Sequence, residues 1–397
     1  MLTGSRGLVE TNKRLRPDRA LQRAFGRMGC AEQSTLSETL NAATAENVQE
    51  LEQALTTIYR RFSRGYRHDY AKHWQILDAD TSGLPAGKKA ELCTKGYFAR
   101  QRNRRGRQLA RVVASRYDEI VTDQVYAGKV QLTECLQPLL QQAAQVLELD
   151  AAKRARTILR VDAGGGSAGD VNWMLEHDYQ LITKDYSSKR AAKLAQTVQA
   201  WYPDPKVKGR EVGWVTQPHP YARATTQIAV RSPKKNGRFG YAVLITTLSA
   251  ADILALVGQP RAKAKDVHSV LLAYVAFYDA RSGGAETQIK GDKQGLGLTK
   301  RNKKSIAAQQ IVVLLAMLAH NVILWARQWL AGSAPQLQHY GIVRMVRDVL
   351  TMRGRVQFEA DTSQRQIILD QADRLAKTIS VGLRRLLKNT GVSINLG

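Results

Sequence analysis

The stretch ILRVDAGGGSAGDVNWMLEHDYQLITK, residues 158–184, contains a complete series of secondary-structure changes. Apolar and β-branched residues up to Val161 are typical of a buried strand, and Asp162 ends that strand. Three glycines follow, then a helix-like pattern over residues 171–177, then a second apolar run, YQLITK. A strand, a turn, a helix and a strand in this order predict part of an α/β sheet. Three different chemistries use such a turn.

The first is dinucleotide binding. Gly164, Gly166 and Gly169 have the G-x-G-x-x-G spacing, and Asp185, about 20 positions further on, could bind the ribose. However, Asp162 would place a negative charge beside the pyrophosphate, and this repulsion disfavours such a site. The sequence therefore predicts no nucleotide cofactor.

The second is nucleophilic catalysis. Residues 165–169 match G-x-S-x-G, in which Ser167 would be the attacking group on a strand-to-helix turn. Such a serine needs a histidine base, and the candidates are His219, His268 and His320. None has a sequence context that marks it as a base, and His320 lies inside an apolar segment typical of a core helix. Serine hydrolysis is therefore disfavoured.

The third is metal-dependent phosphoryl transfer, for which the chain supplies several carboxylates. Asp78 and Asp80 lie on one face of the predicted strand ILDAD, because side chains alternate along a strand. Asp162 ends another strand, and Glu286 follows a glycine pair at the start of a helical segment. Two-metal chemistry needs several carboxylates around ions a few ångströms apart. Hard oxygen ligands suit Mg²⁺, with Mn²⁺ as a substitute. Asp78 and Asp80 both remain candidates for the first ligand.

The charge of the chain indicates its class of partner. Sixty Lys and Arg residues against 34 Asp and Glu give a net charge of +26. A positive field of this size attracts polyanions, so we expect a nucleic-acid partner. An anionic membrane is the alternative, but the charge is spread along the chain rather than gathered on one amphipathic helix. We therefore expect no membrane partner.

The cysteines and the chain start indicate the compartment. Three cysteines lie far apart, with no CxxC pair and no histidine at metal-ligand spacing, so neither a disulfide framework nor a zinc site is indicated. The basic residues near Met1 are not followed by an apolar stretch, so we expect no secretion signal. We expect a cytoplasmic, nucleoid-associated protein.

The pattern of helices and strands divides the chain into five segments. Residues 1–70 are predicted to be helical, and residues 71–186 to alternate strands and helices. Residues 187–265 are predicted to be a β-rich insertion with a hairpin at Asn236-Gly237. The α/β pattern resumes over residues 266–330. There, residues 306–330 are apolar but contain Gln, His, Asn and Arg, which predicts a long buried core helix started by Thr299 or Ser305. Residues 331–397 are predicted to be mostly helical and basic.

One segment resembles a known signature. YDARSGGAETQIKGDK contains Tyr278, Arg281, Glu286 and Lys293. It resembles the Tyr/Arg/Glu/Lys signature of bacterial insertion-sequence transposases with an RNase H-like DDE core. In that family two, three and six residues separate the four positions, whereas here the numbers are two, four and six, so Arg281 departs by one residue. The segments LDADTSGLPAG and RVDAGGGSAGDVNWMLEHDYQLITK resemble the family's regions around its first and second aspartates.

The resemblance covers roughly residues 30–330 and implies both fold and activity. It implies an RNase H-like mixed sheet with a β-rich insertion and helical regions at both ends. It assigns Asp80, Asp162 and Glu286 as catalytic, Mg²⁺-binding residues of a DNA transposase. Such an enzyme binds the terminal inverted repeats of its element, cleaves with metal-activated water and joins the 3′ hydroxyl to target DNA. Residues 1–70 would bind the DNA ends, residues 331–397 would help dimerisation, and the partners would be double-stranded DNA and a second copy in a synaptic complex.

Several residues are predicted to contact DNA. Tyr278 and Arg281 would bind phosphates, although Tyr278 could instead pack in the core. Lys293 lies seven residues after Glu286, so both would share one face of a helix, and Lys293 would hold a phosphate. Trp214 and Trp201 could stack on an extrahelical base or belong to the core. The arginine run RQRNRRGRQLAR is expected to contact the DNA backbone through Arg100, Arg102, Arg104, Arg105 and Arg107.

Two smaller roles follow. The glycines at 164–166 are expected to let the DNA backbone approach the metals, and Asp170 is expected to cap the helix that follows. Two other functions remain open: a catalytically inactive basic DNA-binding protein, and a host nuclease with an RNase H-like core.

Overall fold

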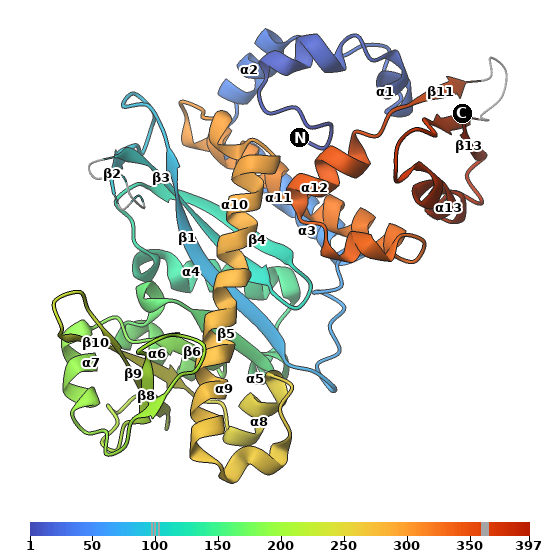
Figure 1. Ribbon diagram of the computed structural model, residues 1–397. Helices are drawn as coiled ribbons and strands as arrows, with labels where there is room; N and C mark the ends of the chain where they lie inside the picture. The colour runs from blue at the N-terminus through green and yellow to red at the C-terminus, as the bar shows by residue number, and fades with distance from the viewer. Residues whose placement is uncertain (97, 99–100, 102–103, 359–364) are drawn as a thin grey trace. The chain divides into compact units, whose positions relative to one another are not determined.

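Figure 1 shows the computed structural model, which describes residues 1–96, 98, 101, 104–358 and 365–397. The chain forms two compact units. Unit 1 comprises Met1–Ser63, Gly83–Arg107 and Gln288–Gly397, and unit 2 comprises Arg64–Ser82 and Gln108–Thr287.

A mixed sheet forms the centre of unit 2. Its core strands are β1 (Gln75–Pro85), β3 (Arg105–Ala114), β4 (Glu119–Ala127), β5 (Thr157–Val161) and β6 (Gln180–Lys184). β5 lies between β1 and β6 and is parallel to both. On the other edge of β1, β3 runs antiparallel to it, and β4 pairs with β3. Helices α4 (Leu132–Leu147) and α5 (Ala151–Ala155) connect β4 to β5, and α6 (Ala168–Glu176) connects β5 to β6. This confirms the predicted mixed α/β fold and is consistent with an RNase H-like core.

The opening stretch folds as its pattern predicts. Every residue of β5 is buried, as expected for a central parallel strand covered on both faces. A short 3₁₀ turn, Ala163–Gly165, follows it, and α6 then begins. The helix cap is Ser167, whose hydroxyl accepts the Asp170 N–H, so the prediction that Asp170 is the cap was wrong. Asp170 lies in the first turn and is buried, where it accepts hydrogen bonds from the hydroxyls of Ser167 and Thr133.

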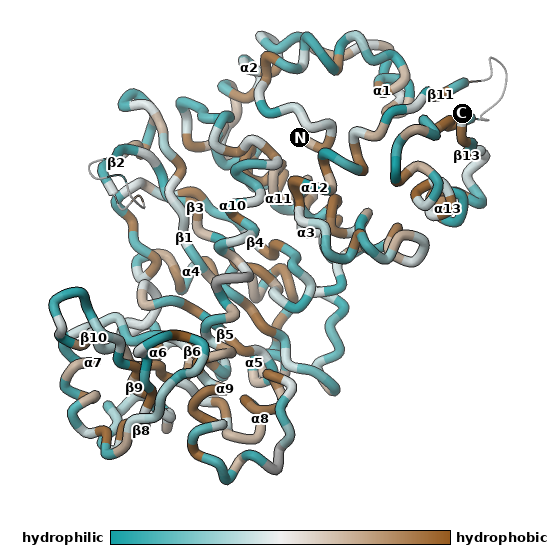
Figure 2. Tube along the Cα trace, viewed as in Figure 1, coloured by the Kyte–Doolittle hydropathy of each residue, from teal (hydrophilic) through white to brown (hydrophobic). Residues whose placement is uncertain are grey.

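Residues 187–265 contain most of the remaining strands. The elements are α7 (Ser188–Ala195), β7 (Tyr202–Pro203), β8 (Glu211–Trp214), β9 (Thr226–Pro233), β10 (Phe239–Thr246), α8 (Ala250–Leu256) and a 3₁₀ helix, Arg261–Lys265. The predicted hairpin joins β9 and β10, and Gly237 takes the positive φ of +74° that the turn needs. Because β10 pairs antiparallel with β6, these strands extend the core sheet. α8 and the following α9 (Val267–Asp279) carry many hydrophobic residues (Figure 2).

Two core strands, β3 and β4, were not predicted from the sequence. Their charged residues suggested a solvent-exposed segment, yet nearly all of β3 is buried. Arg111 of β3 and Asp123 of β4 form a bidentate ion pair with both side chains fully buried, at 2.7 Å for each contact. Arginines that pair inside a sheet hide the alternating pattern by which strands are recognised.

Unit 1 is mainly helical. It contains a π-helical turn (Thr11–Leu15), α1 (Arg19–Ala24), α2 (Gln33–Asn41), α3 (Ala45–Phe62), the short β2 (Thr94–Lys95), 3₁₀ turns at Leu298–Lys300 and Pro335–His339, α11 (Ile306–Ala331), α12 (Ile342–Arg344) and a second π-helical turn (Met345–Leu350). The predicted N-terminal helices are therefore present. α3 begins with a capping box at Thr44 and Asn47 and packs on α11.

α11 is the predicted long core helix. By length and composition it could cross a membrane, but 67% of its most apolar window is buried within the protein. Its polar residues Gln309, His320 and Asn321 are buried as well. Ser305 caps the helix by accepting the Ala308 N–H, so of the two predicted start residues Ser305 is confirmed.

The end of the chain is less helical than predicted. Besides α13 (Ala376–Leu386), it contains a three-stranded sheet of β11 (Gly354–Phe358), β12 (Arg365–Leu369) and β13 (Val392–Leu396). Each strand has only five residues, which is too short for an alternating pattern to stand out from the basic sequence around it.

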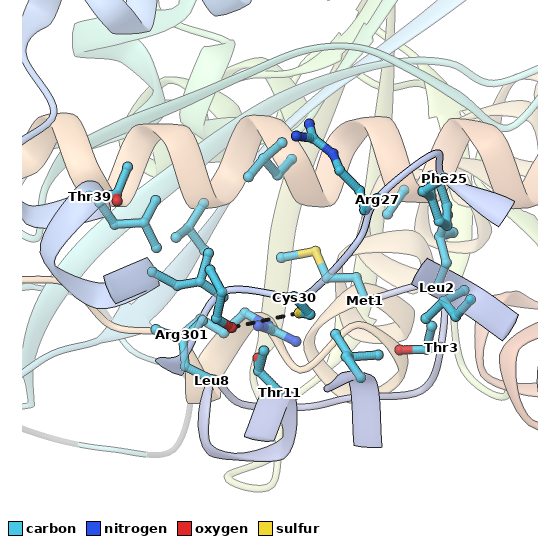
Figure 3. Close-up of a pocket in the computed structure, with 18 of the residues that line it drawn as sticks. Met1, Leu2, Thr3, Leu8, Thr11, Phe25, Arg27, Cys30, Thr39 and Arg301 are labelled. Atoms are coloured by element: carbon cyan, nitrogen blue, oxygen red, sulfur yellow. Dashed lines mark hydrogen bonds between the residues drawn. The ribbon is translucent and has the colours of Figure 1, made fainter. Parts of the chain in front are cut away.

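Unit 1 also contains an apolar cavity of about 820 Å³ (Figure 3). Its walls include Leu8 and Phe25 from the N-terminal helical region and Val312 and Leu315 from α11. None of the predicted catalytic residues lines it.

Candidate functional site

Two layers of charged side chains lie where the carboxyl end of β5 runs beside the middle of β1. The parallel register pairs Asp78 with Arg160 and Ala79 with Val161. Beyond these register pairs, Asp80 follows on β1 and Asp162 follows the end of β5, and the charge of Asp162 acts on Asp80. Because side chains alternate along a strand, both pairs face the same side of the sheet. The first layer thus joins an acid to a base, and the second joins two acids.

The first layer is a buried ion pair. Arg160 Nε and Nη2 donate to the two carboxylate oxygens of Asp78, at 2.6 and 2.8 Å. Asp78 is fully buried, and only 6% of the Arg160 side chain is exposed. Both Asp78 oxygens are therefore engaged by a guanidinium, which corrects the prediction that Asp78 is a metal ligand. Sequence inspection missed Arg160, although it lies two residues before Asp162 on the same strand face.

The second layer contains a carboxyl group with a raised pKa, that of Asp80. Burial first, and then the charges of Asp162 and Glu286, raise the pKa of Asp80 to about 6, against the opposing effects of Arg281 and the Thr81 N–H. Asp80 Oδ1 accepts the Thr81 N–H at 2.8 Å, and Arg281 Nη1 lies 3.3 Å from Asp80 Oδ2. The three predicted catalytic acids therefore interact electrostatically.

Asp162 precedes a turn that its side chain stabilises, and Glu286 lies in the first turn of a helix. Asp162 Oδ1 accepts the Gly164 N–H at 2.8 Å and so fixes the turn after β5. Glu286 is exposed in the first turn of α10 (Ala285–Gly295), where a negative charge is favoured by the helix dipole. The predicted helix that contains Glu286 and Lys293 is thus present.

These acids have the hard oxygen donors that Mg²⁺ or Mn²⁺ prefers, and their mutual repulsion is the kind that a cation relieves. They are not, however, grouped around a common point. Over the described ranges of the chain, no three His, Cys, Asp or Glu side chains are placed so that they could hold one metal ion. In this arrangement the positive charge beside Asp80 is the Arg281 guanidinium.

Arg281 and Tyr278 lie beside the acids. Arg281 belongs to a 3₁₀ turn, Ala280–Gly283, and 14% of its side chain is exposed. Burial alone would lower the pKa of Arg281, but Asp80, Tyr278 and Asp162 raise it above its usual value. The guanidinium carbon lies 5.9 Å from the centre of the Tyr278 ring. Burial raises the pKa of Tyr278 to about 12. The ring also packs against the core cluster that α8 and α9 form with the strands of the sheet, so the predicted core role of Tyr278 is present.

The arginine run has two kinds of member. Arg100 and Arg102 lie outside the described residues. Arg104 and Arg105 are exposed and stay predicted DNA contacts. Arg107 is fully buried, so its predicted DNA contact was wrong.

Arg107 instead joins three parts of unit 1. Its guanidinium donates to the backbone oxygens of Glu91, Lys303 and Lys304 at 2.7 to 2.9 Å and to Gln309 Oε1 at 3.2 Å. These acceptors explain why a charged side chain is tolerated there.

Lys293 and the tryptophans have partners within the protein. Lys293 Nζ donates to the Gly83 backbone oxygen at 2.8 Å. Trp214, at the end of β8, packs against the core cluster and meets the Tyr274 ring edge-on at 5.9 Å, which favours the core role over base stacking. The Arg231 guanidinium lies 4.3 Å from the centre of the Trp201 ring.

The glycine cluster is explained by packing of the protein itself. A Cβ on Gly166 would lie 1.8 Å from the Lys184 backbone oxygen, and one on Gly165 would lie 2.4 Å from a Val161 methyl group. The proposed reason, approach of a DNA backbone, is therefore not needed. Ser167 serves as the helix cap, and Asp185, the candidate ribose ligand, is 3% exposed and pairs with Arg190 at 2.6 Å.

Comparisons with known proteins add little to this geometry. No family model matches the chain, and no curated protein matches it. Among solved structures, the chain is similar to the cryo-EM structure of the piggyBac transposase synaptic complex with hairpin DNA. The TM-score is 0.40 and the sequence identity 13%, and the match covers 80% of this chain and 54% of the piggyBac chain. This chain therefore spans about half the length of that transposase.

Proposed function

We propose that this protein is a metal-dependent DNA phosphoryl transferase, and specifically a DNA transposase that cuts at terminal inverted repeats and joins the freed 3′ hydroxyl to target DNA. The observation that carries the proposal is the second layer. Asp80 lies close enough to Asp162 and Glu286 for their charges to act on it, and burial together with these charges raises the pKa of Asp80 to about 6. Perturbed acids of this kind are typical of catalytic sites. The net charge of +26 supplies the attraction to DNA.

The roles of the residues follow from their positions. Asp80, Asp162 and Glu286 would hold Mg²⁺ or Mn²⁺. At these residues, Mg²⁺ or Mn²⁺ would supply an activated water and a positive charge opposite the phosphoryl oxygens. Arg281, which contacts Asp80 in this structure, would bind a DNA phosphate when a cation compensates the charge of the acids. Its planar guanidinium suits a phosphate ligand. Arg104 and Arg105 would contact the backbone outside the site.

The remaining expectations also belong to the proposal. Residues 1–70 would bind the element ends, residues 331–397 would support a dimer in the synaptic complex, and the protein would act on nucleoid DNA in the cytoplasm. A second candidate is a DNA-binding protein without cleavage activity. It is favoured by one observation, that no three-ligand group forms among the described side chains.

The test is cleavage of DNA that carries the inverted repeats flanking the gene. We expect Mg²⁺-dependent nicking by the wild type and its loss, with DNA binding retained, in Asp80→Ala, Asp162→Ala and Glu286→Ala. Glu176→Ala, at an exposed position at the end of α6, is the matched control and should cut normally. Cleavage retained in any of the three site variants contradicts its assignment. A band shift without nicking would support the inactive binder, and equal cutting of unrelated DNA would indicate a host nuclease.

A further inference from the structure

We propose that the buried Asp78–Arg160 pair is a positioning pair that holds residues 277–284, the segment carrying Tyr278 and Arg281, over the acids Asp80 and Asp162. The catalytic importance of this positioning rests on the proposed function. The positioning itself is inferred from contacts within unit 2.

The pair contacts the start of the segment. Arg160 uses Nε and Nη2 for Asp78, and its remaining Nη1 donates to the Phe277 backbone oxygen at 2.8 Å. The guanidinium carbon also lies 5.0 Å from the centre of the Phe277 ring. Phe277 is buried near the end of α9, so this bond ties the end of that helix to β5.

The pair also contacts the end of the segment. A Cβ on Gly284 would lie 2.4 Å from Asp78 Oδ2, so the backbone at Gly284 rests directly on this carboxylate. The Gly284 N–H in turn donates to the Arg281 backbone oxygen at 2.9 Å. The placement of Gly284 therefore carries over to Arg281, whose Nη1 lies 3.3 Å from Asp80 Oδ2.

Stability alone does not explain a charged pair at this place. Two buried charges lose their hydration, and the attraction between them often repays little more than that loss. Here the pair does something that apolar residues of the same volume could not do. Arg160 has a donor left for the Phe277 oxygen, and Asp78 adds a negative charge that acts on Arg281. One charged pair thus fixes both ends of the segment.

The same sheet offers a matched control. Arg111 and Asp123 form a second bidentate pair, fully buried like the first, between β3 and β4. Asp123→Asn and Asp78→Asn each leave one buried guanidinium without its carboxylate, so both should lower stability. Only Asp78→Asn should release residues 277–284.

The experiment compares amide hydrogen exchange of peptides covering residues 277–287 in the full-length variants. In Asp78→Asn we expect exchange of these peptides to rise at least about tenfold, with no such rise in Asp123→Asn. The double variant Asp78→Asn/Arg160→Gln removes both charges, so it should regain much of the lost stability without regaining protection of 277–287. Recovery of stability without recovery of protection in the double variant distinguishes a positioning role from a merely structural one. Gly284→Ala, which forces the Asp78 carboxylate aside, should give the same local loss of protection even if Asp78→Asn does not fold.

Equal exchange in Asp78→Asn and Asp123→Asn would overturn the proposal, and so would full protection of 277–287 in the double variant. Nicking of DNA is measured in parallel. The exchange-impaired variants should cut at least about tenfold more slowly, while Asp123→Asn, corrected for its folded fraction, should not. If the wild type cuts no DNA at all, the proposed function fails, but the exchange data still decide whether the pair holds the segment.

Discussion

The ionised carboxylate of Asp80 should reduce the stability of the folded protein, and this can be measured without any substrate. Burial and the neighbouring acids raise its pKa from 3.8 to about 6, and only 15% of the side chain is exposed. A folded-state pKa above the unfolded value means that the native state binds the proton more tightly. The contribution of Asp80 to the free energy of unfolding is therefore fully present below about pH 4 and is lost as the pH rises through 6.

The size of the effect follows from the same values. Each tenfold change in proton affinity corresponds to ~1.4 kcal/mol, so a pKa raised from 3.8 to about 6 corresponds to about 3 kcal/mol of lost stability above pH 6. Asp80→Asn keeps the acceptor for the Thr81 N–H but removes the charge. It should thus be more stable than the wild type by up to about 3 kcal/mol at pH ~8, and by about half of that at pH ~5.

Urea unfolding in the presence of a chelator, at both pH values, measures this difference. Glu176→Gln, which neutralises an exposed carboxyl, is the control and should change stability little at either pH. Added Mg²⁺ should narrow the gap at pH ~8, because it stabilises only the protein that keeps the charge. The reasoning is refuted if Asp80→Asn is less stable than the wild type at pH ~8, or if its advantage does not change with pH.

Two further predictions concern residues whose roles the structure changed. Arg107→Ala should cost about 3 to 5 kcal/mol in urea unfolding, because it removes a buried guanidinium with four acceptors. Arg105→Ala should leave stability within about 0.5 kcal/mol and reduce the salt dependence of DNA binding by about one counterion, and equal effects of the two variants would contradict this division. Gly166→Ala should destabilise the protein by about 3 kcal/mol or more, since its Cβ meets the Lys184 backbone, whereas Gly169→Ala meets nothing closer than 3.9 Å and should be tolerated. A stable Gly166→Ala variant with weakened DNA binding would restore the explanation from DNA approach.

The comparison of the two layers shows where prediction from sequence stopped. Asp80, Asp162 and Glu286 were predicted from their places on a strand face, at a strand end and at a helix start. In the structure the charges of Asp162 and Glu286 act on Asp80. Alternation along one strand put Asp78 and Asp80 on the same face and left both as candidates for the first ligand, although the resemblance favoured Asp80. What separates them is Arg160, 82 residues away, which engages only Asp78. The parallel register of β1 and β5 decides that pairing, and no local pattern contains it.

The sequence by itself determined the elements whose signals are local. These are the strand, turn, helix and strand of residues 158–184, the Asn236-Gly237 hairpin, the buried helix α11 with its Ser305 cap, and the positive charge that attracts polyanions. Only the tertiary structure decided which charged residues are buried. Arg107, Arg111 and Arg160 look like surface residues in the sequence, yet each is buried because its partners come from other elements. A charged side chain can be buried only where hydrogen-bond acceptors or opposite charges surround it. The positions of these partners depend on the fold of the whole chain.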